Sequence, residues 1–167
     1  MSFPETVDSW IATRALSILS EDEDLRAYAR GGFQDYELEN LLDIGGAALV
    51  VPHVAVLLVT QAEVPRDRLH LTGLLVGLVT AMGQARGTGG FERARVVGHL
   101  MRTLWADRES FTWTPEGASA PRYTFSSLAF SRQGPPRQLA GSRKYLFTPV
   151  ALEVTTFECL QEERTVL

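Results

Sequence analysis

The residues best placed to do chemistry form a glycine-rich segment between an apolar run and an amphipathic stretch. Four glycines fall within Gly83–Gly90, directly ahead of Phe91. An apolar run, a glycine-rich turn and a helix, in this order, are typical of a phosphate-binding loop, where backbone N–H groups at the helix start hold an anion. This layout would make the protein a binder of nucleotides or other small ligands.

Both well-known phosphate-binding motifs are incomplete in this segment. A Walker loop places a lysine, then Ser or Thr, after its last glycine, but Phe91 and Glu92 follow Gly90, and the single lysine is Lys144. A dinucleotide fingerprint needs a third glycine for close packing of helix and strand, and Glu92 stands in its place. We therefore interpret Gly83–Gly90 as a flexible connection, and keep a small-ligand or nucleotide-binding enzyme subunit as the alternative function.

Histidine and cysteine are the other residue types that could do chemistry. His53 and His70 fall in consecutive predicted strands, but neither belongs to an H-x-H or H-E-x-x-H pattern or has a cysteine partner. The single Cys159 excludes an intrachain disulfide and suits a reducing compartment. A G-x-S-x-G nucleophile elbow is absent from the sequence. We expect no catalytic residue, no metal and no cofactor, and so no enzyme.

The composition is that of an ordinary globular domain. With 167 residues, 45% hydrophobic content and a net charge of -4, the chain suits one domain over residues 1–167. A mildly acidic chain without a lysine-rich stripe does not predict nucleic-acid recognition, and its broken apolar stretches do not predict a membrane span. Met1–Glu5 lacks the basic start of a secretory signal, in agreement with the reducing, cytoplasmic assembly site that the single Cys159 suggests.

Capping patterns and hydrophobic periodicity predict the elements that would position these residues. Two S-x-x-E patterns, Ser2 with Glu5 and Ser20 with Glu23, predict the starts of two helices. The first helix would bury residues at helical spacing: Val7, Ile11, Ala15, Ile18 and Leu19. The second helix would be short, and an amphipathic stretch would follow it over residues 33–42.

The remaining elements are mostly strands. Residues 48–59 and 67–79 read as two strands joined by a loop over 61–67, with Pro52 at a strand start or edge. A helix over 93–105 would turn Ala94, Val97, Leu100, Met101 and Leu104 inward, and Glu92, Arg95, His99 and Arg102 outward. Strands follow at 121–132, with a bulge near Ser126–Ser127, and at 144–158, on either side of a loop over 133–142. This order predicts an α+β domain whose antiparallel sheet has about four strands, with helices mainly on one face.

Charge is segregated along the chain, and this suggests contacts between copies. The basic candidates for a subunit interface are Arg93, Arg95, Arg102, Arg132 and Arg137, and the acidic candidates are Glu37, Glu39 and Asp43. Phe33, Tyr36 and Trp113 are the aromatic candidates, because they lie outside the periodic core positions; Phe33 and Tyr36 could equally close the domain's own core. Acidic and basic faces of successive copies would meet head to tail, and such contacts can close into a ring.

The order of these parts resembles the tail terminator proteins of long-tailed phages, especially the contractile-tailed group. The resemblance covers roughly Thr6 to Glu158, and its most telling pieces are "GGF" at 31–33 with the following "DYELENLL", and "VPHVAV" at 51–56. It implies an α+β subunit, six copies of which form a ring that caps the tail tube and stops its growth. It further implies the tail–neck junction of the virion as location, and the tube protein and neck or sheath proteins as partners. No catalysis or cofactor is implied.

Overall fold

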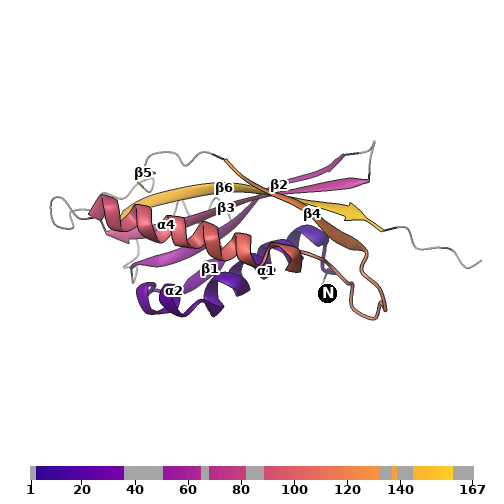
Figure 1. Cartoon of the computed structure of the whole chain (residues 1–167), viewed down its shortest axis with the longest axis horizontal. Coiled ribbons are helices and arrows are strands. Elements are labelled where there is room, and N and C mark those ends of the chain that lie inside the picture. The colour runs from indigo at the N-terminus through magenta and orange to yellow at the C-terminus, as the bar shows by residue number, and fades with distance from the viewer. Residues whose placement is uncertain are drawn as a thin grey trace, which may run out of the picture.

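The computed structural model describes residues 3–35, 51–64, 68–81, 89–131, 137–138 and 145–159. Among these residues, three helices lie on the same side of one sheet (Figure 1): α1 (Val7–Glu21), α2 (Glu23–Tyr28) and α4 (Gly89–Ala106). The strands are β1 (Phe33–Asp35), β2 (His53–Val64), β3 (Leu69–Ala81), β4 (Tyr123–Phe130), β5 (Arg137–Gln138) and β6 (Tyr145–Glu158), and a short 3-10 helix, η2, covers Arg108–Ser110. The predicted α+β class is confirmed. No described helix is long and apolar enough to cross a membrane.

The sheet runs in the order β1-β2-β3-β6-β4, and β5 pairs with β6. All pairs are antiparallel except β1 with β2. The described residues form six strands rather than about four, because the sequence did not indicate the short strands β1 and β5. The predicted bulge in β4 is confirmed by a register shift between Phe125 and Ser127. β2 continues to Val64, so Gln61 to Val64, expected in a loop, belong to the sheet.

Strand β1 occupies the start of the stretch that looked amphipathic. Phe33 lies opposite Val54 in a parallel pairing. Gly32 has a φ of 85°, a conformation that favours glycine, and it turns the chain from the end of α2 into the sheet. The Gly31 N–H donates to the Pro52 carbonyl at 2.9 Å, which ties this turn to the beginning of β2. Residues 36–42 lie outside the described part of the chain.

Both predicted helix starts were wrong by a few residues. Thr6 rather than Ser2 caps α1: its hydroxyl accepts from the Ser9 N–H, and the Ser9 hydroxyl oxygen accepts from the Thr6 N–H. Asp22 rather than Ser20 caps α2, accepting from the Leu25 N–H at 2.9 Å. A capping residue has an extended backbone, as Thr6 and Asp22 do, whereas Ser20 still lies within α1.

The main core lies between the helices and the sheet. All five apolar α1 residues predicted to face inward are buried there, which confirms the helical period. From α4, Val97, Leu100 and Leu104 join them. Ala94 is exposed, and so was wrongly placed on the inner face, whereas His99, expected outside, is half-buried. The helix begins at Gly89, four residues earlier than predicted.

The second face of the sheet carries no described helix (Figure 1). At one end it holds a smaller buried cluster that includes Ala55, Leu57, Val79 and Phe147. The packing of the Phe147 ring there depends on Gly77, because a Cβ at this position would lie 2.0 Å from Cε2 of Phe147. The glycine therefore leaves room for the aromatic ring above the sheet.

Candidate functional site

The structure places six of the eleven predicted interface residues. Phe33, Arg93, Arg95, Arg102, Trp113 and the backbone of Arg137 are described. Tyr36, Glu37, Glu39, Asp43 and Arg132 lie outside the described residues, as do residues 82–88 of the glycine-rich segment. The proposed pairing of the arginines with that acidic group therefore stays a prediction. Gly89 and Gly90 form the first turn of α4.

Trp113 does not lie outside the core, and this expectation was wrong. Its side chain is 7% exposed and belongs to the main core. The ring stacks on Tyr123 with centroids 6.0 Å apart, and the two backbones form a β-bridge. The segment after η2 thus folds back onto the beginning of β4, a non-local contact that local periodicity does not report. Phe33 is half-buried and packs against the same core.

The outer side of α4 carries an exposed row of aromatic and arginine side chains. Phe91 is 74% exposed and Trp105 47% exposed, and Arg95 and Arg102 are also exposed. At roughly 100° per residue, these four positions and Gly98 fall within an arc of about 80°. We call Phe91, Arg95, Gly98, Arg102 and Trp105 the α4 stripe. The sequence pattern missed Phe91, because the predicted helix began at Arg93, and it did not assign Trp105 to the outer face.

The centre and the C-terminal end of the α4 stripe have distinct shapes. A Cβ at Gly98 would meet Nη1 of Arg102 at 3.6 Å, so the Arg102 guanidinium lies over the middle of the stripe. The Arg108 guanidinium lies 4.3 Å from the centre of the Trp105 ring and also donates to the Trp105 carbonyl at 2.8 Å. This cation–π contact fixes the orientation of the indole, while about half of Trp105 stays accessible.

Arg93 lies apart from the α4 stripe. It is half-buried, and its Nε atom is buried with no hydrogen-bond partner among the described residues. Burial, and then the nearby Glu92 carboxylate, raise the pKa of Tyr28 above its ordinary 10.0, while Arg93 partly offsets this rise. An open hollow of about 290 Å³ lies beside these residues, lined by Ala27, Tyr28, Arg30, Val51, Pro52 and Glu92.

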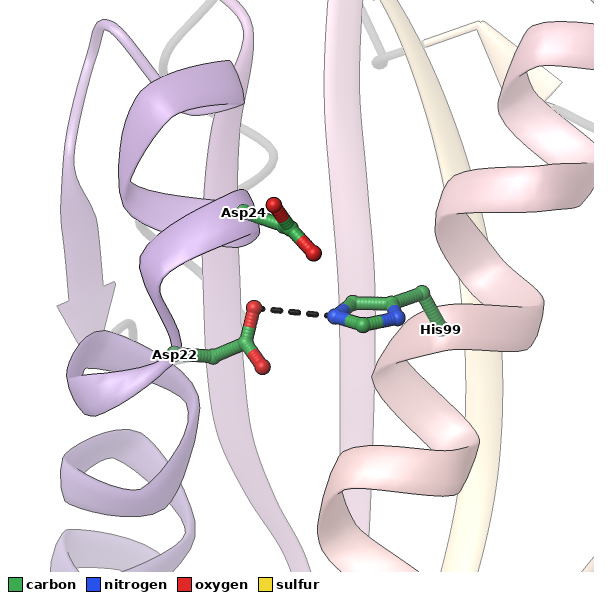
Figure 2. Close-up of side chains that lie close together, drawn as sticks. All are labelled: Asp22, Asp24 and His99. Atoms are coloured by element: carbon green, nitrogen blue, oxygen red, sulfur yellow. Dashed lines mark hydrogen bonds and ion pairs between the residues drawn. The ribbon is translucent and has the colours of Figure 1, made fainter.

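Three potential metal ligands converge where α1, α2 and α4 meet (Figure 2): Asp22, Asp24 and His99, with donor atoms within 4.8 Å of one another. Hydrogen bonds already account for much of this arrangement. Asp22 Oδ1 accepts from the Leu25 N–H and lies 2.9 Å from Nε2 of His99. Burial raises the pKa of Asp22, but the bonds from Leu25 and His99 outweigh it, so the pKa lies below the ordinary 3.8. The cluster joins the cap of α2 to α4.

The other two histidines do not form a site together. His53 pairs with Val79 in the sheet, whereas His70 pairs with Glu63 near the far end of the same two strands. His70 instead meets Asp8 of α1, with Nε2 at 2.8 Å from Oδ1, and the Thr72 hydroxyl donates to the same oxygen at 2.7 Å. Because this group is largely buried between α1 and β3, it holds a helix on the sheet.

The open end of the second sheet face offers a different surface. Val154 packs in the main core, and successive side chains of a strand point to opposite faces. Glu153 and Phe157 therefore lie on the face that carries no helix of the described residues, which we call the helix-free face, and both are exposed there. Phe157 is 47% exposed and lies opposite Leu69, and Leu71 is the next residue of β3 on this face. We call Glu153, Phe157, Leu69 and Leu71 the open sheet end.

Comparison with known proteins gives no family for the chain. No family model matches it, and no curated protein matches it. A solved structure that carries a systematic designation without a stated function is similar, with a TM-score of 0.44 and 10% sequence identity. The likeness covers 92% of this chain and 99% of the other. A similarity of this size carries no argument about function.

Proposed function

We propose that the protein is a structural subunit that joins head to tail into a closed ring, as the phage tail terminators that its sequence resembles do. In this role the ring caps the tail tube, stops its growth and forms the joint to the neck. Its partners are further copies of the chain, the tube protein and neck or sheath proteins. The tail identity comes from the sequence resemblance, whereas ring formation also has support in the folded surface.

The observation that carries the ring is the presence of two unlike accessible surfaces on opposite sides of the domain. The α4 stripe faces away from the sheet, with Phe91 at 74% and Trp105 at 47% exposure. The open sheet end, with Phe157, lies on the face that the described helices leave uncovered (Figure 1). A head-to-tail contact joins two different patches of the same chain, and such contacts close into rings when the rotation between copies permits.

The composition of the α4 stripe also supports a contact surface. Trp and Arg are enriched among residues that dominate binding energy at protein interfaces, and aromatic anchors bury large apolar area. Single exposed apolar residues are ordinary on any protein. The α4 stripe instead gathers two aromatic and two arginine side chains on one narrow arc of one helix, so these residues form a cluster rather than isolated exposed positions.

The experiment is a measurement of mass against concentration for the pure protein, by light scattering and sedimentation, with negative-stain images of the largest species. We expect growth from 18.4 kDa to a fixed plateau, with ring-shaped particles. A mass that stays at the monomer value at every concentration would contradict the proposal, as would growth without a plateau. A thermal shift with ATP, GTP or NAD would favour the small-ligand alternative instead.

A further inference from the structure

We infer that the α4 stripe of one copy packs lengthwise onto the open sheet end of the next copy, with an arginine of the stripe paired to Glu153. This contact rests on the proposed ring, since it takes a second copy of this chain as the occupant. It deepens that proposal by stating how the two surfaces pack together and which charges pair.

The first argument is the way the chain covers its own sheet. On one face, α1 and α4 pack against the strands and bury apolar residues from both layers. Sheets in globular proteins bury their apolar faces against helices or another sheet. The open sheet end keeps Phe157 47% exposed and Leu69 and Leu71 half-buried. A helix from a neighbour would complete a second covering layer at this end.

The second argument is the fit of lengths. From Phe91 to Trp105 the helix rises about 21 Å, at 1.5 Å per residue. From Ala151 to Phe157 strand β6 spans about 20 Å, at 3.4 Å per residue. The stripe can therefore lie along this part of β6 with one aromatic end over Phe157 and the other at the level of Ala151. Gly98 adds no side chain of its own to the middle of the stripe, which the Arg102 guanidinium covers.

The third argument is charge. Glu153 is an exposed carboxylate on the helix-free face, and it lies about 14 Å from Phe157 along the strand. When Trp105 lies beside Phe157, Arg95 falls about 15 Å away along the helix axis, and when Phe91 lies there, Arg102 falls about 16 Å away. In either direction an arginine reaches Glu153. Charge then sets the register, while the apolar contact supplies most of the affinity.

The native Cys159 provides a direct test, because it lies two residues beyond Phe157 and is half-exposed. A benzophenone maleimide is attached to Cys159 of one batch of subunits. These subunits are mixed with a second batch, which is 15N-enriched and carries no benzophenone. The mixture is allowed to assemble and is then illuminated. We expect cross-links to 15N peptides of α4. A matched control is the Cys159→Ser, Ser119→Cys variant with the same label, because Ser119 is exposed in the segment between η2 and β4; we expect no cross-link from it to α4.

Charge reversal provides the second readout. Arg95→Glu with Arg102→Glu should raise the apparent Kd of assembly roughly tenfold, Glu153→Arg should also raise it, and the triple variant should recover much of the loss. Arg26→Glu with Arg30→Glu changes the net charge as much as the double arginine reversal does, at exposed positions of α2 and its end, and should leave assembly unchanged.

The outcomes separate the contact from the ring. Assembled material that cross-links through Cys159 to an element other than α4, or gives no cross-link between copies, overturns this contact and leaves the ring standing. Equal effects of the α4 reversal and the α2 reversal also overturn it. A protein that stays monomeric without label or substitution overturns both proposals.

Discussion

Asp8 Oδ1 lies 2.8 Å from Nε2 of His70, and this pair joins α1 to β3 across the helix–sheet interface. The same oxygen accepts from the Thr72 hydroxyl at 2.7 Å. The side chains of Asp8 and His70 are 5% and 12% exposed, so water replaces these bonds poorly when one partner is removed. The group therefore fixes the position of α1 on the sheet.

Replacement of Asp8 by alanine should destabilise the fold, because it leaves His70 and Thr72 without their shared acceptor. Hydrogen bonds to a charged group contribute roughly 1.5–3 kcal/mol, and we expect a loss of that size in the free energy of unfolding, measured by urea denaturation. Asp107→Ala is a suitable control, because Asp107 is exposed and makes no side-chain capping bond. Equal losses in both variants would contradict the structural role of Asp8.

Two glycine-to-alanine substitutions should have opposite effects. At Gly77 the new Cβ would lie 2.0 Å from the Phe147 ring, so Gly77→Ala should cost about 1–3 kcal/mol through overpacking. A smaller residue at 147 should relieve part of this cost, so the effect of Gly77→Ala should shrink in a Phe147→Ala background. Denaturation of the unchanged protein, the two single variants and the double variant tests this coupling. Strictly additive losses in the free energy of unfolding would argue against the contact between the Gly77 position and the Phe147 ring.

Gly98→Ala should instead stabilise the isolated subunit. Gly98 lies in the interior of α4, and its new Cβ would meet an arginine nitrogen at an ordinary 3.6 Å. Alanine is favoured over glycine inside a helix by about 1 kcal/mol. If the α4 stripe packs against a neighbouring copy, the methyl group added at its centre should weaken assembly. A higher melting temperature would support the position of Gly98 inside a helix. Unchanged assembly of the same variant would contradict the α4 stripe as a subunit interface.

The Asp22–His99 pair predicts a pH dependence with a defined sign. Because the pKa of Asp22 is lower in the folded protein than its ordinary 3.8, the carboxylate contributes stability above that pH. This contribution is lost as the pH falls through the folded-state pKa. Asp22→Asn should keep the helix cap, since Asn is also a good capping residue, and should flatten the fall in stability as the pH drops through and below the ordinary 3.8. The free energy of unfolding is measured against pH for the unchanged protein and for Asp22→Asn. If both fall equally with pH, the stabilising role of the Asp22–His99 pair is contradicted.

The glycine-rich segment should bind no nucleotide. Gly89 and Gly90 lie in the first turn of α4, followed by exposed Phe91 and Glu92 rather than by lysine. The carboxylate would oppose a phosphate at this helix start. We expect calorimetry with ATP, GTP and NAD, each with magnesium, to give no saturable heat. Binding tighter than roughly millimolar, about 4 kcal/mol, would favour the small-ligand alternative.

Local patterns predicted the elements better than their partners. The period of α1 and the bulge in β4 are visible in the sequence, because each depends on neighbouring residues. Strand β1 depends on a parallel pairing of Phe33 with Val54, far along the chain. Its three residues are too few to show the alternation of apolar and polar side chains that indicates a strand. Trp113 looked exposed for the same reason: its burial depends on Tyr123, which a turn brings beside it.

The candidate surface was predicted in part. The arginines of α4 are evident from their spacing, and Arg95 and Arg102 are exposed as expected. Phe91 was missed because two glycines precede it, and glycine is a poor indicator of a helix start. The open sheet end could not be inferred, because Glu153 and Phe157 become a surface through their place on the helix-free face of the sheet.

The most direct test of the central claim is the mass of the assembled protein at equilibrium, measured by sedimentation across concentration. A ring predicts a single plateau at a fixed multiple of 18.4 kDa, six copies if the resemblance to tail terminators extends to stoichiometry. Negative-stain images of that species should show closed particles with a central hole. A mass of one subunit at every concentration, or a continuous distribution of open chains, would contradict the account.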